Sequence, residues 1–230
     1  MKTIGLLGGM SWESTQTYYR LLNEGVKERL GGLHSAKLIL YSVDFAEIEA
    51  LQHQGKWAET ANILSRAARA LEQAGADFLV IGTNTMHKVA PEIEKSIGIP
   101  LLHIADATAG VLKRDGVSSV GLLGTRFTME QEFYRERLEQ TGIQVIIPDE
   151  PERELIHRVI YEELCQGEII QASKQAYLEI VASLAERGAQ AVILGCTEIG
   201  LLIRQEDTSV SLYDTTELHA AQAVEKALAT

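Results

Sequence analysis

Short apolar runs alternate with longer amphipathic stretches along the whole chain. The apolar runs are rich in Val, Ile and Leu and predict strands at residues 3–7, 36–41, 78–81, 101–104, 119–123, 144–147, 191–194 and 209–213. The amphipathic stretches predict helices at residues 14–29, 58–74, 130–140, 153–165, 172–187 and 216–229. Continuously apolar strands separated by helices are typical of parallel sheets that are covered on both faces. The pattern predicts an α/β protein.

Two of the predicted helix starts carry capping pairs. Thr128 is followed by Gln131, and Asp214 is followed by Glu217. A short polar side chain with Glu or Gln three residues later is a typical start signal, because the two side chains bind backbone N–H groups of the first turn. We therefore expect helices to begin at both positions.

An internal repeat links the two parts of the chain. The sequence GLLG at residues 5–8 recurs at residues 121–124, an offset of 116. The segment 71–83 matches the segment 184–196 at an offset of 113. Two matches in one order at nearly equal offsets favour a duplicated unit over chance.

The repeat predicts a domain organisation. We expect two similar parallel-sheet α/β domains related by pseudo-twofold symmetry, with the active site in the cleft between them. The N-terminal domain is expected to comprise residues 1–105 plus 210–230, and the C-terminal domain residues 106–209. Ligands of open α/β sheets bind outside the carboxyl ends of the strands. The loops there contain small polar residues and precede helices, so their N–H groups suit carboxylates; they are residues 8–11, 83–85, 124–126 and 196–198.

Composition and charge narrow the class of partner. The chain has 230 residues, of which 46% are hydrophobic and 23% charged, as in ordinary globular proteins. Its 32 acidic and 21 basic residues give a formal net charge of −11. Such a balance argues against nucleic acid and anionic membranes as partners. No apolar run matches a membrane helix or a signal-peptide core, and the two cysteines form no CxxC pair. We expect a cytoplasmic protein.

The candidate chemistry centres on Cys196, which follows an apolar strand on a glycine turn. A cysteine at a helix N-terminus can be held as a thiolate, whereas a buried structural cysteine is inert, and both interpretations stay open. Glu198 can bind a substrate nitrogen or lie in solvent, and a carboxylate so close would raise the pKa of the thiol. Cys165 lies on an amphipathic helix, where packing is the expected role.

Common cofactor motifs are missing from the sequence. Gly5, Gly8 and Gly9 have the spacing of neither a GxGxxG fingerprint nor a Walker loop. No HExxH pattern, clustered Cys/His spacing or GxSxG element occurs. We expect no dinucleotide, nucleotide or metal cofactor. The polar run 52–54 is interpreted as a lid over the cleft or as an exposed helix end.

Three segments resemble the cofactor-independent aspartate/glutamate racemase family. They are GLLGGMS at residues 5–11, GTNTMH at residues 82–87 and GCTE at residues 195–198. The resemblance runs along essentially the whole chain, and Glu198 after Cys-Thr is similar to the aspartate racemase branch. It implies a two-domain α/β homodimer that acts on a small acidic amino acid without pyridoxal phosphate or metal. The family pattern also implies two cysteines on opposite faces of the substrate α-carbon.

The sequence departs from that pattern at Thr83, which occupies the N-terminal cysteine position. Only Cys196 matches the family's pair. A thiol has a pKa of about 8.5 and can give or take a proton near neutrality, whereas a threonine hydroxyl is a far weaker acid. We therefore expect Cys196 to deprotonate the L-enantiomer and Thr83 to supply the opposite proton, which makes catalysis faster from the L side.

The resemblance also implies residues that surround the substrate. Positions around its amino and carboxyl groups are the Met10 backbone, Asn84, Thr85 and Thr197. Gln52 stands where family members contact the side-chain carboxylate, often with a basic residue. Thr125, the repeat mate of Gly9, is a further candidate carboxylate donor.

Two other functions are also compatible with the sequence. A single-cysteine enzyme of the same superfamily, such as a malonate-type decarboxylase or a hydantoin racemase, would also keep only the C-terminal cysteine. A two-lobed protein that binds an acidic ligand without turning it over is the second alternative, because one of the two cysteines is missing.

Overall fold

The structure is a computed structural model that describes residues 1–229. The chain forms two compact units, one of residues 1–104 with the segment from His219 onward, the other of residues 105–218. Each unit has its own sheet of four parallel strands. The α/β class predicted from the hydrophobic pattern is confirmed.

The second boundary lies later than predicted. We expected residue 210 to open the return to the first unit, but the return begins at His219. The reason is that strand β8 (Ser211–Asp214) pairs with β7 (Ala191–Gly195) in the second sheet. The crossing then falls inside helix α11 (Thr215–Leu228).

The first sheet has the strand order β2-β1-β3-β4. Its strands are β1 (Ile4–Gly8), β2 (Leu38–Ser42), β3 (Phe78–Ile81) and β4 (Leu101–Leu102). The helices that start in this unit are α1 (Trp12–Leu30), α2 (Phe45–His53), α3 (Trp57–Gln73), the 3-10 helix η1 (Thr85–Val89), α4 (Ala90–Ser96) and α5 (Ile104–Arg114).

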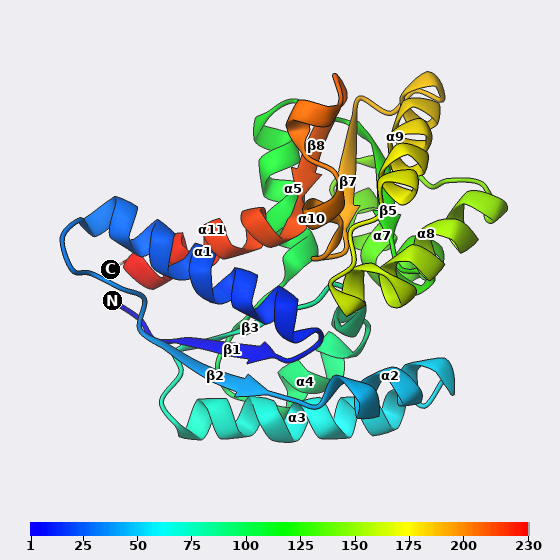
Figure 1. Cartoon of the computed structure of the whole chain (residues 1–230). Coiled ribbons are helices and arrows are strands. Elements are labelled where there is room, and N and C mark those ends of the chain that lie inside the picture. Colours follow the sequence, from blue (N-terminus) through cyan, green and yellow to red (C-terminus); the bar gives the residue numbers. More distant parts are fainter. Residues whose placement is uncertain (230) are drawn as a thin grey trace. The chain divides into compact units, whose positions relative to one another are not determined.

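Both faces of this sheet are buried, which explains its continuously apolar strands. Ile4 and Leu6 pack with residues of α1 and α11 in one cluster. Leu7 and Leu79 point to the other face and pack with residues of α3 and α4. Figure 1 shows α1 and α11 on one side of β1 and α3 on the other. Side chains alternate across a strand, so one apolar run serves two cores.

The second sheet repeats the same order, β6-β5-β7-β8. The remaining strands are β5 (Ser119–Gly124) and β6 (Gln144–Ile146). The other helices of this unit are α6 (Arg126–Glu130), α7 (Glu132–Glu139), α8 (Glu150–Glu162), η2 (Leu164–Gln166), α9 (Gln171–Glu186), α10 (Ile199–Leu202) and η3 (Gln205–Asp207). Its core joins Leu123 and Val192 to residues of α8 and α9, and partly buried Cys165 packs against it, as predicted.

The matching glycines of the repeat do the same structural work in both units. A Cβ at Gly5 would lie 3.5 Å from Cβ of Leu71, and a Cβ at Gly121 would lie 3.2 Å from Cβ of Leu184. Leu71 and Leu184 are themselves repeat mates. In each unit a glycine in the first strand lets a long helix approach the sheet closely: α3 in the first unit and α9 in the second. The repeat therefore marks two copies of one strand–helix packing.

One of the two capping predictions is confirmed and one is wrong. Asp214 accepts hydrogen bonds from the N–H groups of Thr216 (2.7 Å) and Glu217 (3.3 Å) at the start of α11. Helix α6 instead begins after Thr125, whose hydroxyl oxygen accepts from the N–H of Thr128. The helix starts one turn earlier than expected, because Thr125, directly after β5, already serves as the N-cap. Among the described residues, no helix is long and apolar enough to span a membrane.

Candidate active site

The glycine-rich loop after β1 is held by its own hydroxyl groups. Gly9 has φ +90°, and a Cβ there would overlap the carbonyl oxygen of Val43, so only glycine fits. Its N–H donates to Thr15 Oγ1 at 2.7 Å, so this group serves the fold and not a ligand. Ser11 caps α1 by accepting from the N–H of Ser14. The Ser14 hydroxyl donates to the carbonyl of Gly82 at 3.0 Å and binds this loop to the end of β3.

The segment after β3 brings several predicted site residues of the first unit together. Thr83 is half-buried, while Asn84 and Thr85 are buried. Gln52 on α2 is buried too, and its Nε2 lies 2.8 Å from Sδ of Met86 in the same segment. Gln52 itself is therefore not exposed, and its amide contacts Met86. His53 and Gln54 lie exposed at the end of α2, as the helix-end interpretation expected.

Met10 contributes its backbone rather than its side chain. The side chain is 2% exposed and packs in the apolar cluster that contains Leu7 and Met86. The backbone of Met10 stands between β1 and the capping residue Ser11. The role of the Met10 main chain toward a ligand stays a prediction.

Cys196 stands directly after β7 and is buried. Its Sγ donates to Oε2 of Glu198 at 3.0 Å. The hydroxyl of Thr197 donates to the same oxygen at 2.6 Å. One carboxylate oxygen thus collects two side-chain donors, which fixes the thiol, the hydroxyl and the carboxylate in a single buried group.

The electrostatics of this group keep the proton on sulfur. Burial raises the pKa of the Cys196 thiol well above its usual range, and the charge of Glu198 raises it further. The following helix α10 has only four residues and starts after Glu198, so its dipole offers little compensation. Of the two interpretations left open by the sequence, the raised pKa favours a thiol over a thiolate in the resting state. The sulfur is a thiol whose proton already points at a base.

Thr125 lies next to Cys196 at the edge of the second sheet. Each residue follows a glycine, and those glycines, Gly124 and Gly195, are register partners in β5 and β7. The Thr125 oxygen caps α6 and lies 3.3 Å from Oγ1 of Thr128. The cap uses this oxygen as an acceptor of the Thr128 N–H.

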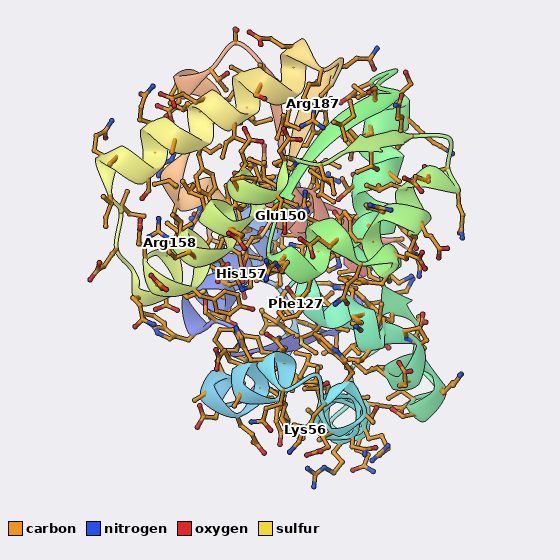
Figure 2. All side chains as sticks on the ribbon, turned by 90° about the vertical axis from the view of Figure 1, so that its right-hand side faces the viewer. Lys56, Phe127, Glu150, His157, Arg158 and Arg187 are labelled. Carbon is orange, nitrogen blue, oxygen red and sulfur yellow. The ribbon has the colours of Figure 1, made fainter. Side chains whose placement is uncertain are left out.

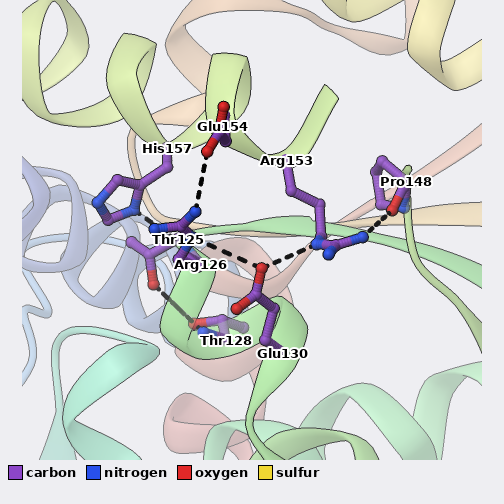
Figure 3. Close-up of polar contacts among 8 residues, drawn as sticks. All are labelled: Thr125, Arg126, Thr128, Glu130, Pro148, Arg153, Glu154 and His157. Atoms are coloured by element: carbon purple, nitrogen blue, oxygen red, sulfur yellow. Dashed lines mark hydrogen bonds and ion pairs between the residues drawn. The ribbon is translucent and has the colours of Figure 1, made fainter. Parts of the chain in front are cut away.

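Arg126 places a cation directly after Thr125, but carboxylates surround it. Its guanidinium lies 3.2 Å from Glu154 and 3.6 Å from Glu130 (Figure 3). Its backbone N–H donates to Nδ1 of His157 at 3.1 Å. Figure 2 shows His157 of α8 beside Phe127, with ring centroids 5.9 Å apart. These contacts hold the start of α6 against α8. The positive charge of Arg126 is paired with the carboxylates of Glu130 and Glu154.

Three residues outside the predicted site set hold the loops of the first unit. Ser14 and Thr15 bind the loop after β1. His87 donates to the carbonyl of Thr83. The pattern Ser11-x-x-Ser14-Thr15 at a helix start was a usable signal, because such hydroxyls bind nearby backbone groups. Among residues 1–229, no group of three or more His, Cys, Asp or Glu side chains is arranged to hold a metal ion.

Each unit thus presents a small polar residue where its third strand in chain order ends. In the second unit that residue is a thiol bonded to a carboxylate. In the first it is the half-buried hydroxyl of Thr83 among buried amide and hydroxyl groups. Such groups can move a proton and can bind carboxylates, and this chemistry is what a proton-transferring isomerase uses.

Comparison with known proteins agrees with this class. The sequence model of the Asp/Glu/hydantoin racemase family matches residues 7–223, and the chain belongs to that family. It is 22% identical, over 98% of both chains, to the broad specificity amino-acid racemase RacX of Bacillus subtilis (strain 168).

Solved structures give the same result. A Yersinia pestis protein solved as a candidate Asp/Glu racemase is 57% identical over 100% of both chains, with a TM-score of 0.93. An aspartate racemase homologue from Pyrococcus horikoshii OT3 is 37% identical over 99% of both chains, with a TM-score of 0.86. The racemase family and the isomerase class predicted from the sequence are confirmed.

Proposed function

We propose that this protein racemises an acidic amino acid, aspartate or glutamate, without pyridoxal phosphate, and that it works faster from the L side. The observation that carries the proposal is the 3.0 Å hydrogen bond from Cys196 Sγ to Glu198 Oε2, set against a threonine at the matching place of the first unit. Family membership and racemase relatives support the reaction class.

The first step is removal of the α-proton by Cys196. The thiol proton passes to Oε2 of Glu198, and the resulting thiolate takes the proton from the α-carbon of the L-enantiomer. The electron pair of that C–H bond moves into the substrate carboxylate as an enediolate. Because the pKa of the thiol is raised, the thiolate is scarce at neutral pH, and we expect slow turnover.

The second step is return of a proton to the opposite face. The hydroxyl of Thr83 gives its proton to the carbanion and regains one from solvent. Glu198 releases to solvent the proton that it took from Cys196, which closes the cycle. In the reverse direction a threonine would have to act as base, which its very weak acidity makes unfavourable. Both directions still reach the same equilibrium, and only the rates differ between enantiomers.

The polar residues near Cys196 and near Thr83 would bind the substrate. We propose that Asn84, Thr85 and Thr197, with the backbone of Met10, hold the amino and carboxyl groups, and that Thr125 adds a carboxylate donor. Gln52 would meet the side-chain carboxylate. Preorganised donors of this kind stabilise a developing enediolate, since no electron-sink cofactor shares the charge.

Proton NMR in deuterated buffer tests the proposal. Purified protein without added cofactor is mixed with L- and D-aspartate and with L- and D-glutamate, and loss of each α-proton signal is followed. We expect exchange on an L-enantiomer to be clearly faster than on its D-enantiomer. Cys196→Ser should slow exchange by about 10²–10⁴-fold, the usual contribution of a positioned acid–base group, and Cys165→Ser should leave it unchanged.

Other outcomes would separate the alternatives. Exchange that survives in the folded Cys196→Ser variant would contradict the role of the thiol. No exchange on any of the four amino acids would overturn the racemase proposal for these substrates. Carbon dioxide release from a malonate-type acid would then favour the decarboxylase, which the single cysteine also fits.

A further inference from the structure

Three buried histidines cluster behind Thr83 in the first unit. His87 follows Thr83 in η1, His103 follows β4, and His219 lies in α11. All three are at most 3% exposed. The ring centroid of His87 lies 4.5 Å from that of His103 and 5.9 Å from that of His219.

Hydrogen bonds define which nitrogen of His87 carries its proton. The N–H of Ile104 donates to Nε2 of His87 at 3.3 Å, so Nε2 is the unprotonated nitrogen. Nδ1 lies 2.8 Å from the carbonyl oxygen of Thr83, and a carbonyl can only accept, so Nδ1–H donates. His87 is therefore neutral in the Nδ1–H tautomer, with both nitrogens engaged by backbone groups.

The other rings and the burial keep this state stable. His219 donates from Nε2 to the carbonyl of Leu102 at 2.8 Å, and Tyr18 Oη lies 2.8 Å from its Nδ1. Burial lowers the pKa of His87 well below its usual range, and nearby His103 and His219 lower it further. Burial lowers the pKa of His219 to about 4. His87 and His219 thus stay uncharged near neutral pH and are unsuited to general acid–base chemistry on a substrate.

We propose that His87 is a positioning residue that fixes Thr83 for proton delivery by joining the Thr83 carbonyl to the backbone N–H of Ile104. Ile104 is the last residue before the chain leaves the first unit. One rigid, neutral ring therefore links the candidate proton donor to the first chain crossing. The inference rests on the proposed function, because it assigns His87 to the Thr83 half of that reaction.

The physical reason is the precision that proton transfer requires. A donor must come within hydrogen-bond reach of the carbon it protonates, and a misplacement of about 1 Å can cost roughly 10²-fold in rate. Thr83 follows β3 and precedes the 3-10 helix η1, so it lies outside both the strand and the helix. The His87 bond supplies the missing restraint on that peptide group.

Two substitutions separate the two hydrogen bonds of the ring. In His87→Asn the amide nitrogen stands where Nδ1 was and can still donate to Thr83. In His87→Gln the side-chain end stands where Nε2 was and reaches toward Ile104 but not Thr83. The exposed residue His34 provides the control variant His34→Gln.

The readout is the stereochemistry of deuterium incorporation from the L-substrate. Incorporation with retention reports the Cys196 side, and incorporation with inversion reports the Thr83 side. We expect His87→Gln to lower the ratio of inversion to retention at least about tenfold, and His87→Asn and His34→Gln to keep it near wild type. Equal ratios in all variants of an active enzyme would overturn this inference and leave the proposed function standing.

A measurement on the unmodified protein is independent of turnover. Nitrogen NMR of the histidine side chains should show His87 as the neutral Nδ1–H tautomer. Finding the Nε2–H tautomer or a charged ring would overturn the inference even if the variants fail to fold. No exchange by the wild type would instead overturn the proposed function, and the role of His87 in it would fall too.

Discussion

The two strand-end segments at residues 82–87 and 195–200 occupy matching places in two sheets of the same order, yet they hold protons differently. In the second unit Cys196 donates to Glu198. The repeat mate of Glu198 in the first unit is Thr85, so Thr83 has no carboxylate at the matching place. The same sheet order therefore carries a thiol proton in the second unit and a hydroxyl group in the first.

The two units also differ in the residues that lie behind these strand ends. The repeat mate of His87 is Gly200, and a Cβ at Gly200 would overlap a carboxylate oxygen of Asp214. Asp214 ends β8 as His103 follows β4, at the matching register position. The first unit fills this place with two rings and the second with a glycine and a carboxylate. Duplication preserved the backbone packing, while the polar groups behind the strand ends diverged.

Apart from the loss of Cys196 itself, the largest effect is expected from removing the carboxylate beside the thiol. Glu198→Gln should slow α-proton exchange on the L-enantiomer about 10²-fold, because the thiol proton loses its acceptor. The same change should lower the pKa of Cys196, since the charge of Glu198 helps to raise it, but burial should still hold it above the usual range.

The pH dependence follows from the sign of that shift. The reactive thiolate forms as pH rises, so wild-type exchange should increase with pH, and the rise should move to lower pH in Glu198→Gln. Ultraviolet titration of the thiolate and pH–rate profiles measure both changes. The exposed Glu186 supplies the control Glu186→Gln. A rise at unchanged or higher pH would contradict the pairing.

A second cysteine should make the two half-sites more alike. Thr83→Cys should raise exchange on the D-enantiomer by about tenfold or more, because a thiol can act as a base near neutrality and a hydroxyl cannot. Exchange on the L-enantiomer should change less. Thr83→Ser keeps the hydroxyl and should show no such gain. A folded Thr83→Cys protein without faster D-exchange would count against the two-sided reaction.

The glycines before the two site residues should differ in their tolerance of a methyl group. A Cβ at Gly195 would lie 2.7 Å from the carbonyl oxygen of Leu123, whereas a Cβ at Gly82 would lie 3.4 Å from that of Leu7. Gly195→Ala should therefore lower the free energy of unfolding by about 1–3 kcal/mol, and Gly82→Ala by less than about 1 kcal/mol. Urea unfolding of both variants measures this, and equal losses would contradict the geometry.

A small, pH-dependent effect on stability is expected at Asp214, the counterpart of His103. Burial raises the pKa of Asp214 to about 6, and nearby Glu217 adds to the shift. The folded state then holds a proton that the unfolded state has released between about pH 4 and 6, so the charged carboxylate destabilises the fold above that window. Asp214→Asn keeps a cap for α11 and removes the charge.

This variant should raise the free energy of unfolding by about 1 kcal/mol at pH 7 and by little at pH 4. Denaturant unfolding at both pH values checks the prediction. A gain of equal size at both pH values would point to a cause other than the charge.

The sequence by itself determined the strands and the internal repeat. It also showed that Thr83 and Cys196 occupy equivalent positions of that repeat. These features follow from the periodicity of apolar residues and from the recurrence of short segments along the chain. Helix α5 was missed, because its first residue continues the apolar run of β4. The cap at Thr125 and the crossing at His219 also escaped, since each depends on which strand a segment joins.

Only the tertiary structure decided the protonation of the site. Whether Cys196 is a thiol or a thiolate depends on its burial and on the direction of one carboxylate, and neither is written in a linear motif. The role of His87 depends on Ile104, a residue 17 positions away that folding brings to its ring. Patterns along the chain place groups on elements, but the pKa of a group depends on the neighbours and the water that folding leaves around it.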